Sequence, residues 1–176
     1  MSTLAALAAG CATTGAVPRP FPTPGGPAPV AGAPVPQAEP GVDARAVDPS
    51  RDAYALTGTA LALRGTPYRN GGSDPSGFDC SGFVWYVFDQ RGVHLPRTVT
   101  ELFQTGAPVD RMDLRPGDLV FFDTGSGGSA GRASHVGISI GGDEFVHAPS
   151  TTGQVRVERL ASTYWSPRFL EARRVW

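Results

Sequence analysis

Residues 77–92 read GFDCSGFVWYVFDQRG, a turn-like start followed by an apolar run that ends at a glycine. The pattern predicts a helix from about Cys80 to Arg91, stopped by Gly92. Cys80 would then lie at the helix N-terminus, where unpaired N–H groups and the helix dipole lower the pKa of a thiol from about 8.5. A thiolate there is a nucleophile, and the same N–H groups suit the oxyanion that forms when it attacks a carbonyl.

Two more helices are predicted on either side of this segment. The first can be capped by Ser50 and ended by Gly65, and its apolar residues recur at helical spacing (Leu56, Ala60 and Leu63). The other opens at residues 98–101, TVTE, which have the spacing of a capping box, and it ends at Gly106. Helices therefore fill the first half of the predicted folded part.

The second half of the chain changes to short alternating or apolar runs separated by Gly, Pro or Ser, which predict β-strands. Five such runs cover residues 118–122, 135–140, 144–148, 155–160 and 171–176. The turn GGD at 141–143 would join the second and third of them as a hairpin. Helices followed by a strand meander predict an α+β fold, with N-terminal helices packed on an antiparallel sheet of about five to six strands.

Three histidines are available as a base for the thiol. A nucleophilic cysteine needs a base and a group that orients that base. His94 stands between a helix and a turn and is most simply a surface residue, whereas the hairpin brings His135 and His147 to one end of the sheet. We take His135 as the candidate base and His147 as the candidate orienting residue, with Asp143 or Gln154 as weaker candidates for the second role.

Two other interpretations of these residues are open. A buried cysteine beside hydrogen-bonded strand histidines is common in proteins that have no active site there. A zinc site is the second, but the spacing of Cys80, His135 and His147 matches no usual paired-ligand motif. We therefore expect no metal and no cofactor.

The charge balance argues against partners that bind through a field of one sign. The 15 basic and 16 acidic side chains leave a formal net charge of −1, and the residues from Arg51 onward carry equal numbers of both. Such a surface disfavours binding to nucleic acid. A chain of 176 residues, 40% of them hydrophobic, can form one domain with a sizeable core, and we expect a monomer.

The chain before residue 50 has a different composition. Residues 1–16 hold the apolar stretch TLAALAAGC, which ends at Cys11 and resembles a bacterial lipobox, whose cysteine is acylated. Residues 17–49 hold more than half of the 17 prolines and predict an extended linker without a core, so residues 50–176 are the predicted folded domain. A stray thiol in a disordered start is the alternative for Cys11. A disulfide with Cys80 is disfavoured by the flexible tether between them.

Six motifs of the predicted domain resemble, in their order and spacing, the NlpC-type family of bacterial cell-wall cysteine peptidases. They are GTPYRNGG, FDCSGFVWYVF, HLPRT, LRPGDLVFF, ASHVGISIG and FVHAPS, and the resemblance covers residues 52–176. It implies a papain-like fold in which Cys80 is the nucleophile, His135 the base and His147 the orienting residue. It also implies that Tyr68 lies beside the nucleophile and helps to hold the oxyanion.

The residues that flank the nucleophile have two explanations. Asp79 and Ser81 would shape the substrate cleft, or they would cap the helix that carries the thiol. The chain departs from the family pattern at Asn70, where an aromatic residue is frequent, and at Leu102, where a glutamine is frequent. We expect both departures to line the substrate groove, so that they bear on specificity.

Within the family, the resemblance is closest to small lipoprotein murein endopeptidases of the Gram-negative envelope. It implies hydrolysis of the D-alanyl to meso-diaminopimelate cross-link of peptidoglycan, with cleavage of the γ-D-glutamyl to diaminopimelate bond as the alternative. An alternative of another class is a wall-binding lipoprotein whose cleft is catalytically idle. With a lipid anchor at Cys11, we expect a periplasmic protein held at the outer membrane.

Overall fold

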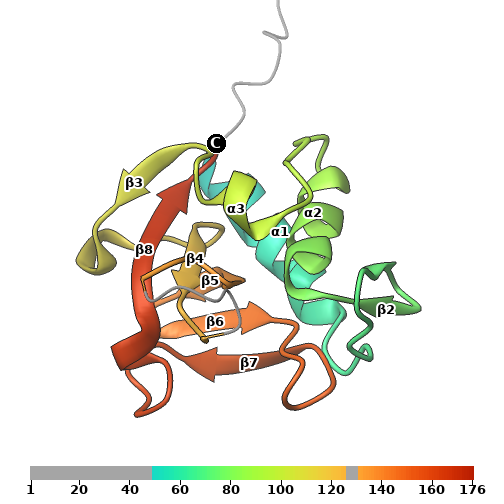
Figure 1. Cartoon of the computed structure of the whole chain (residues 1–176). Helices are drawn as coiled ribbons and strands as arrows, with labels where there is room; N and C mark the ends of the chain where they lie inside the picture. The colour runs from blue at the N-terminus through green and yellow to red at the C-terminus, as the bar shows by residue number, and fades with distance from the viewer. Residues whose placement is uncertain (1–48, 126–130) are drawn as a thin grey trace, which may run out of the picture. The chain divides into compact units, whose positions relative to one another are not determined.

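The computed structural model describes residues 49–125 and 131–176, and within them helices pack on one face of an antiparallel sheet (Figure 1). The helices are α1 (Pro49–Ala62), α2 (Cys80–Asp89) and α3 (Val99–Leu102), and the short 3-10 turns are η1 (Arg111–Asp113) and η2 (Ser166–Arg168). Residues 1–48 lie outside the described part of the chain. They include the lipobox-like segment 1–16 with Cys11 and all of the predicted linker 17–49 except Pro49.

The main sheet has six strands. They are β3 (Ala107–Val109), β4 (Leu119–Phe122), β5 (His135–Gly141), β6 (Glu144–His147), β7 (Arg156–Arg159) and β8 (Phe169–Arg174). Their order across the sheet is β3-β8-β4-β5-β6-β7, and every neighbouring pair is antiparallel. The predicted α+β class with N-terminal helices and an antiparallel sheet is confirmed.

Three strands were not predicted because each is too short to show an alternating pattern. They are β3 of the main sheet and the pair β1 (Ser73–Asp74) and β2 (Gly77–Phe78), which form a separate two-stranded ribbon. A turn closes this ribbon, since the Asp74 carboxylate accepts the backbone N–H of Ser76 at 2.8 Å. The ribbon leads directly into α2, so it fixes where that helix begins.

Helix α2 begins at Cys80 as predicted and ends at Asp89, two residues before the predicted end at Arg91. Asp79 is its N-cap and accepts the backbone N–H of Gly82 at 2.7 Å. At the other end, Gly92 adopts φ 72° and the N–H of Val93 bonds to Phe88 O at 3.1 Å, the pattern of a helix that stops at a glycine. Cys80 is therefore the first residue of the helix.

The two outer helices differ slightly from expectation. Helix α1 begins at Pro49, one residue before the expected cap Ser50, because proline suits the first helical position. Thr98 caps α3, but this helix stops at Leu102 instead of Gly106. Beyond it the chain continues as turns, with i to i+3 bonds from Gln104 and Thr105 to the carbonyls of Glu101 and Leu102.

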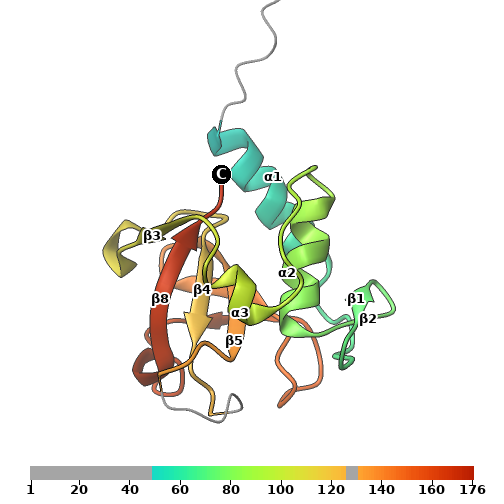
Figure 2. The same cartoon turned by 45° about the horizontal axis from the view of Figure 1, so that its top comes forward.

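Apolar side chains bury both faces of the sheet. Residues of α2 are fully buried against strand residues on the helical face (Phe83, Val84, Val87 and Phe88 against Leu119, Phe121, Val136 and Ile138). On the opposite face a second cluster forms around Phe122, Phe145 and Trp165. In Figure 2, α1 and α2 stand on one side and strands β8, β4 and β5 on the other. This packing fixes the distance between α2 and β5.

Candidate active site

The Cys80 thiol is free and half-buried where α2 faces β5. The backbone N–H groups of Val136, Ser81 and Cys80 itself point at the sulfur and lower its pKa. Burial outweighs them and, together with the Asp79 carboxylate, raises the pKa of Cys80 to about 11. The N–H groups at the helix N-terminus thus lower the thiol pKa in the expected direction, but burial and the Asp79 carboxylate more than offset them.

The contact with Val136 places the sulfur against the residue that follows His135 on β5. His135 is buried, and burial lowers the pKa of its imidazole to about 4. At neutral pH the site therefore holds a protonated thiol and an uncharged imidazole. An uncharged imidazole has a lone pair with which to accept the thiol proton.

The two strand histidines are in direct contact, as the hairpin predicts. His135 Nε2 lies 2.7 Å from His147 Nδ1, a distance at which one ring must donate and the other accept. Burial, the neighbouring imidazole and the Arg156 cation all lower the pKa of His147, so this ring is uncharged too. The pairing leaves His135 Nδ1 as the ring nitrogen available to the thiol.

Trp165 fixes the orientation of both imidazoles. Its ring stacks on His135 at 5.4 Å with an interplanar angle of 25°, and it meets His147 edge to face at 5.0 Å. Trp165 lies just before η2, and no sequence pattern assigned it a role. Its position in a loop without periodicity offered no signal that it would reach the histidines.

Tyr68 lies close enough to Cys80 for the two to interact electrostatically. Burial raises the pKa of the Tyr68 hydroxyl first, and the charges of Cys80 and Asp79 raise it further. The backbone N–H of Tyr68 bonds to Gly153 O at 2.7 Å, which ties this segment to the loop before β7. A hydroxyl that keeps its proton in this position is a hydrogen-bond donor near the sulfur.

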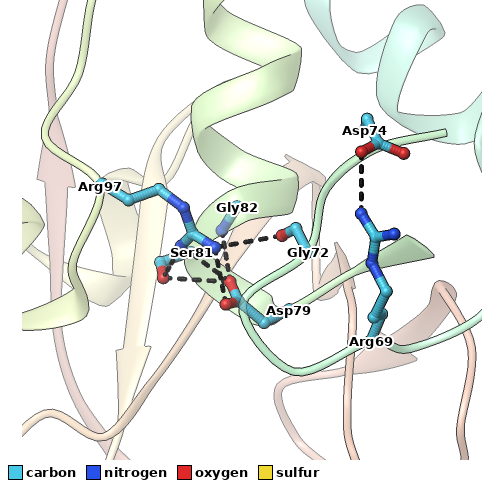
Figure 3. Close-up of polar contacts among 7 residues, drawn as sticks. All are labelled: Arg69, Gly72, Asp74, Asp79, Ser81, Gly82 and Arg97. Atoms are coloured by element: carbon cyan, nitrogen blue, oxygen red, sulfur yellow. Dashed lines mark hydrogen bonds and ion pairs between the residues drawn. The ribbon is translucent and has the colours of Figure 1, made fainter. Parts of the chain in front are cut away.

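An arginine organises the residues that flank the thiol (Figure 3). Arg97 donates two hydrogen bonds to the Asp79 carboxylate, Nη1 to Oδ1 at 2.9 Å and Nη2 to Oδ2 at 2.7 Å. It also donates to Ser81 Oγ at 2.8 Å and to Gly72 O at 3.1 Å. Asp79 therefore caps the helix and pairs with Arg97. Arg97 is part of the HLPRT motif, so a signal for it was present in the sequence.

The other candidate residues have different surroundings. His94 is exposed and pairs with Asp89 at 3.0 Å, which confirms a surface residue. Asp143, a weaker candidate for orienting the base, instead pairs with Arg159 at 3.2 Å. Gln154, the other weaker candidate, is exposed.

The two departures from the family pattern lie in different environments. Asn70 is exposed, in the loop before β1. Leu102 is fully buried in the core against the helical face of the sheet. The expectation that Leu102 lines the substrate groove is therefore wrong, because its side chain fills the core under α3.

Residues 49–125 and 131–176 contain neither a cluster of metal-binding side chains nor a membrane-spanning helix. No three His, Cys, Asp or Glu side chains of these segments are grouped so as to hold a metal ion. Among the helices of the same segments, none combines the length and the hydrophobicity that a bilayer-spanning helix requires.

Comparison with known proteins identifies relatives. The sequence profile of the NlpC/P60 family matches residues 65–174. Murein DD-endopeptidase MepS/Murein LD-carboxypeptidase of Escherichia coli (strain K12) is 46% identical over 113 residues, which are 64% of this chain and 57% of the relative. Gamma-DL-glutamyl hydrolase of Bacillus subtilis (strain 168) is 36% identical over 122 residues, which are 68% of this chain and 29% of the relative. The chain thus spans little more than half the length of the first and under a third of the second.

A solved structure shows the same fold. An NlpC/P60 family protein from Bacillus cereus ATCC 10987 superimposes with a TM-score of 0.65 at 32% sequence identity, over 70% of this chain and 40% of that one. The expected papain-like α+β architecture is confirmed by this likeness and by the six-stranded sheet.

Proposed function

The chain belongs to the NlpC/P60 family, and from that premise we propose that it is a cysteine peptidase that hydrolyses amide bonds of peptidoglycan stem peptides or cross-links. One observation carries the proposal. His135 Nε2 and His147 Nδ1 form a buried pair, 2.7 Å apart. His135 is the neighbour of Val136 on β5, and the Val136 N–H points at the Cys80 sulfur. We infer from this placement that His135 serves as the base for the Cys80 thiol and that His147 orients it.

In the proposed mechanism the thiol and the imidazole are uncharged until the substrate is bound. As the Cys80 sulfur attacks the scissile carbonyl, the thiol proton passes to His135 Nδ1, and His147 accepts a hydrogen bond from His135 Nε2–H. The tetrahedral oxyanion accepts hydrogen bonds from backbone N–H groups near the sulfur and from the Tyr68 hydroxyl, each donor contributing about 3 kcal/mol. The positive charge on His135 and the negative charge on the oxyanion therefore form only when these donors are in place to stabilise the oxyanion.

The second half of the reaction releases the products. His135 Nδ1–H gives its proton to the leaving amine as the C–N bond breaks, which leaves an acyl group on Cys80. Water then attacks the thioester while His135 takes its proton. The sulfur leaves and recovers a proton from His135, so the free enzyme is restored.

For the bond that is cut, we favour the D-alanyl to meso-diaminopimelate cross-link. The support is the similarity to a protein named a murein DD-endopeptidase, at 46% identity. The γ-D-glutamyl to diaminopimelate bond is the second candidate, and the similarity to a protein named a gamma-DL-glutamyl hydrolase, at 36% identity, favours it.

Incubation of the full-length chain with purified muropeptides, both monomeric and cross-linked, tests the proposal. Products are identified by mass spectrometry beside a Cys80→Ala control. Conversion of cross-linked dimers to monomers supports the endopeptidase, and cleavage inside monomeric stems supports the γ-D-glutamyl activity. If neither substrate gives a Cys80-dependent product, the wall-binding protein with an idle cleft becomes the better account.

Iodoacetamide should abolish turnover and a chelator should not.

We also propose that acylation of Cys11 anchors the chain at the outer membrane, where a monomer would face the periplasm. The support is the lipobox-like segment and the Pro-rich stretch that follows it. Cys11→Ala should move the protein from the membrane fraction to the soluble fraction of cells. A wild-type chain that is already soluble in cells would refute the anchor.

A further inference from the structure

One ring nitrogen of the histidine pair has no hydrogen-bond partner within the part of the chain that the structure describes. His147 Nδ1 is paired with His135, but His147 Nε2 is buried and bonds to nothing there. The side chain of His147 is fully buried, so the unpaired nitrogen is costly unless a charge faces it. The carboxylate of Glu158 faces this nitrogen, and its Oε2 lies 3.9 Å from His147 Nε2.

The β6–β7 register explains why Glu158 reaches this place. In the ladder, Phe145 lies opposite Glu158 and His147 opposite Arg156. Side chains two residues apart on a strand share a face, so Glu158 stands diagonal to His147 on the face that carries Phe145 and Trp165. The carboxylate therefore comes from a third strand to meet the pair made by the β5–β6 hairpin.

Two neighbours hold the Glu158 carboxylate in position. Arg156 Nε pairs with Oε1 at 3.0 Å, and Trp165 donates its Nε1–H to Oε2. The Trp165 ring also stacks on His135, so the tryptophan fixes the carboxylate and the base together. The Glu158 side chain is 22% exposed, which leaves its charge only partly screened by water.

We propose that Glu158 is a positioning residue of the site and sets the tautomer of His147. A carboxylate only accepts hydrogen bonds, so it favours the ring form with the proton on Nε2. That form leaves His147 Nδ1 as an acceptor, and His135 must then donate from Nε2 and keep the lone pair on Nδ1 for the thiol proton. This inference rests on the proposed thiol mechanism.

The proposal also has an electrostatic part. When the thiol proton moves to His135, the positive charge forms on the imidazole pair, and the Glu158 carboxylate stabilises it. The Arg156 cation, on the same strand as Glu158, also acts on His147 and opposes this charge. At 3.9 Å the carboxylate is beyond hydrogen-bond length in the resting state, and such contacts tighten as the reaction proceeds.

Glu158→Gln tests the inference in the full-length chain carrying Cys11→Ala, so that Cys80 is the remaining thiol. The rate of Cys80 alkylation by iodoacetamide is measured against pH, beside kcat and KM for muropeptide hydrolysis. Without the carboxylate, the midpoint of the pH dependence of Cys80 alkylation should move up by about one pH unit. At any pH below the midpoint, the alkylation rate should then be about tenfold lower than in wild type. kcat should fall with the same pH shift while KM stays unchanged.

Two variants make the result decisive. Glu158→Asp keeps the charge and should move the midpoint less than Glu158→Gln. If Glu158→Gln does not fold, Glu158→Asp alone is compared with wild type. Glu144→Gln removes an exposed carboxylate from β6 and should leave the profile as in wild type. A Glu158→Gln profile that overlays the wild-type curve, with only the melting temperature lowered, overturns the proposal.

The alkylation arm separates this inference from the proposed function. If wild type hydrolyses no muropeptide, the substrate proposal fails, but the alkylation curves still show whether Glu158 acts on the thiol through the histidines. If muropeptides are hydrolysed and Glu158→Gln leaves both profiles unmoved, the Glu158 inference alone is refuted.

Discussion

Arg97 and Asp79 are joined by two parallel hydrogen bonds of 2.9 Å and 2.7 Å, one residue before the thiol that α2 presents. The same guanidinium reaches Gly72 O, so Arg97 ties the loop before β1 to the N-terminus of this helix. The pairing is bidentate and partly buried, which makes it stronger than a surface ion pair. The position of Cys80 therefore depends on Arg97, although Arg97 lies outside the catalytic series proposed above.

Removal of this guanidinium should destabilise the domain. Arg97→Ala leaves the Asp79 carboxylate and Ser81 Oγ without their donor, and we expect a loss of about 2–3 kcal/mol in the free energy of unfolding. Arg97→Lys should recover only part, because an ammonium cannot make the bidentate contact. Urea denaturation measures both.

A second arginine in Figure 3 is the matched control. Arg69 pairs with Asp74 at 2.8 Å, but both side chains are about half exposed, at 51% and 52%. Arg69→Ala should change the free energy of unfolding by less than about 1 kcal/mol. Equal losses for Arg97→Ala and Arg69→Ala would contradict the role assigned to burial.

Gly82 should not tolerate a side chain. A Cβ at this position would collide with Gly72 O and lie 2.8 Å from Arg97 Nη2. Gly82→Ala must therefore separate α2 from the β1–β2 ribbon, at a cost of about 2 kcal/mol or more. The measurement is again urea denaturation, together with the Cys80 alkylation rate, which should change because the helix N-terminus moves.

Gly58 provides the comparison because it is exposed in the interior of α1 and has nothing within 4 Å of an added Cβ. Gly58→Ala should stabilise the domain by about 0.5–1 kcal/mol through helix propensity and the unfolded chain. A destabilised Gly58→Ala variant would show that local packing of α1 differs from that described.

A buried ion pair anchors the C-terminal strand β8 to the start of β4. Asp118 is fully buried, and its carboxylate accepts Arg174 Nε and Nη2, each at 2.8 Å, and the backbone N–H of Arg115 at 2.8 Å. Asp118→Asn removes the charge that faces Arg174, and we expect a loss of about 3 kcal/mol in the free energy of unfolding. The exposed pair Arg159 and Asp143 is the control, since Arg159→Gln should cost less than about 1 kcal/mol.

Acid should weaken the fold through the two strand histidines. Burial lowers the pKa of His135 to about 4 and that of His147 well below its usual value, so the unfolded chain binds protons that the folded chain does not. The stability that these uncharged rings allow is fully present above about pH 6.5 and is lost as the pH falls toward 4. For His135 the shift corresponds to about 3 kcal/mol.

Urea unfolding at several pH values between 7 and 4.5 measures this dependence. His135→Gln should flatten the curve, whereas His94→Gln, which removes an exposed imidazole, should leave it as in wild type. If His135→Gln and wild type lose stability in parallel as the pH falls, the buried uncharged imidazole is not the cause.

Much of the fold could be predicted from local patterns. The apolar run after Cys80, its cap at Asp79 and its stop at Gly92 specify α2, because each of these is a property of neighbouring residues. The alternation on either side of GGD specifies the hairpin of β5 and β6, and so the contact of His135 with His147. The strands that were missed have two or three residues each, which is too few to show a period.

The sequence by itself determined the fold class, the thiol at the start of a helix and the meeting of the two imidazoles, since these follow from periodicity and turn residues. Only the tertiary structure decided how far the Cys80 thiol is buried and that Leu102 fills the core. It also decided that Glu158 and Trp165 lie against His147, and that Arg97 forms an ion pair with Asp79. Burial and contacts between distant segments depend on how helices pack on the sheet, and no local pattern encodes that packing.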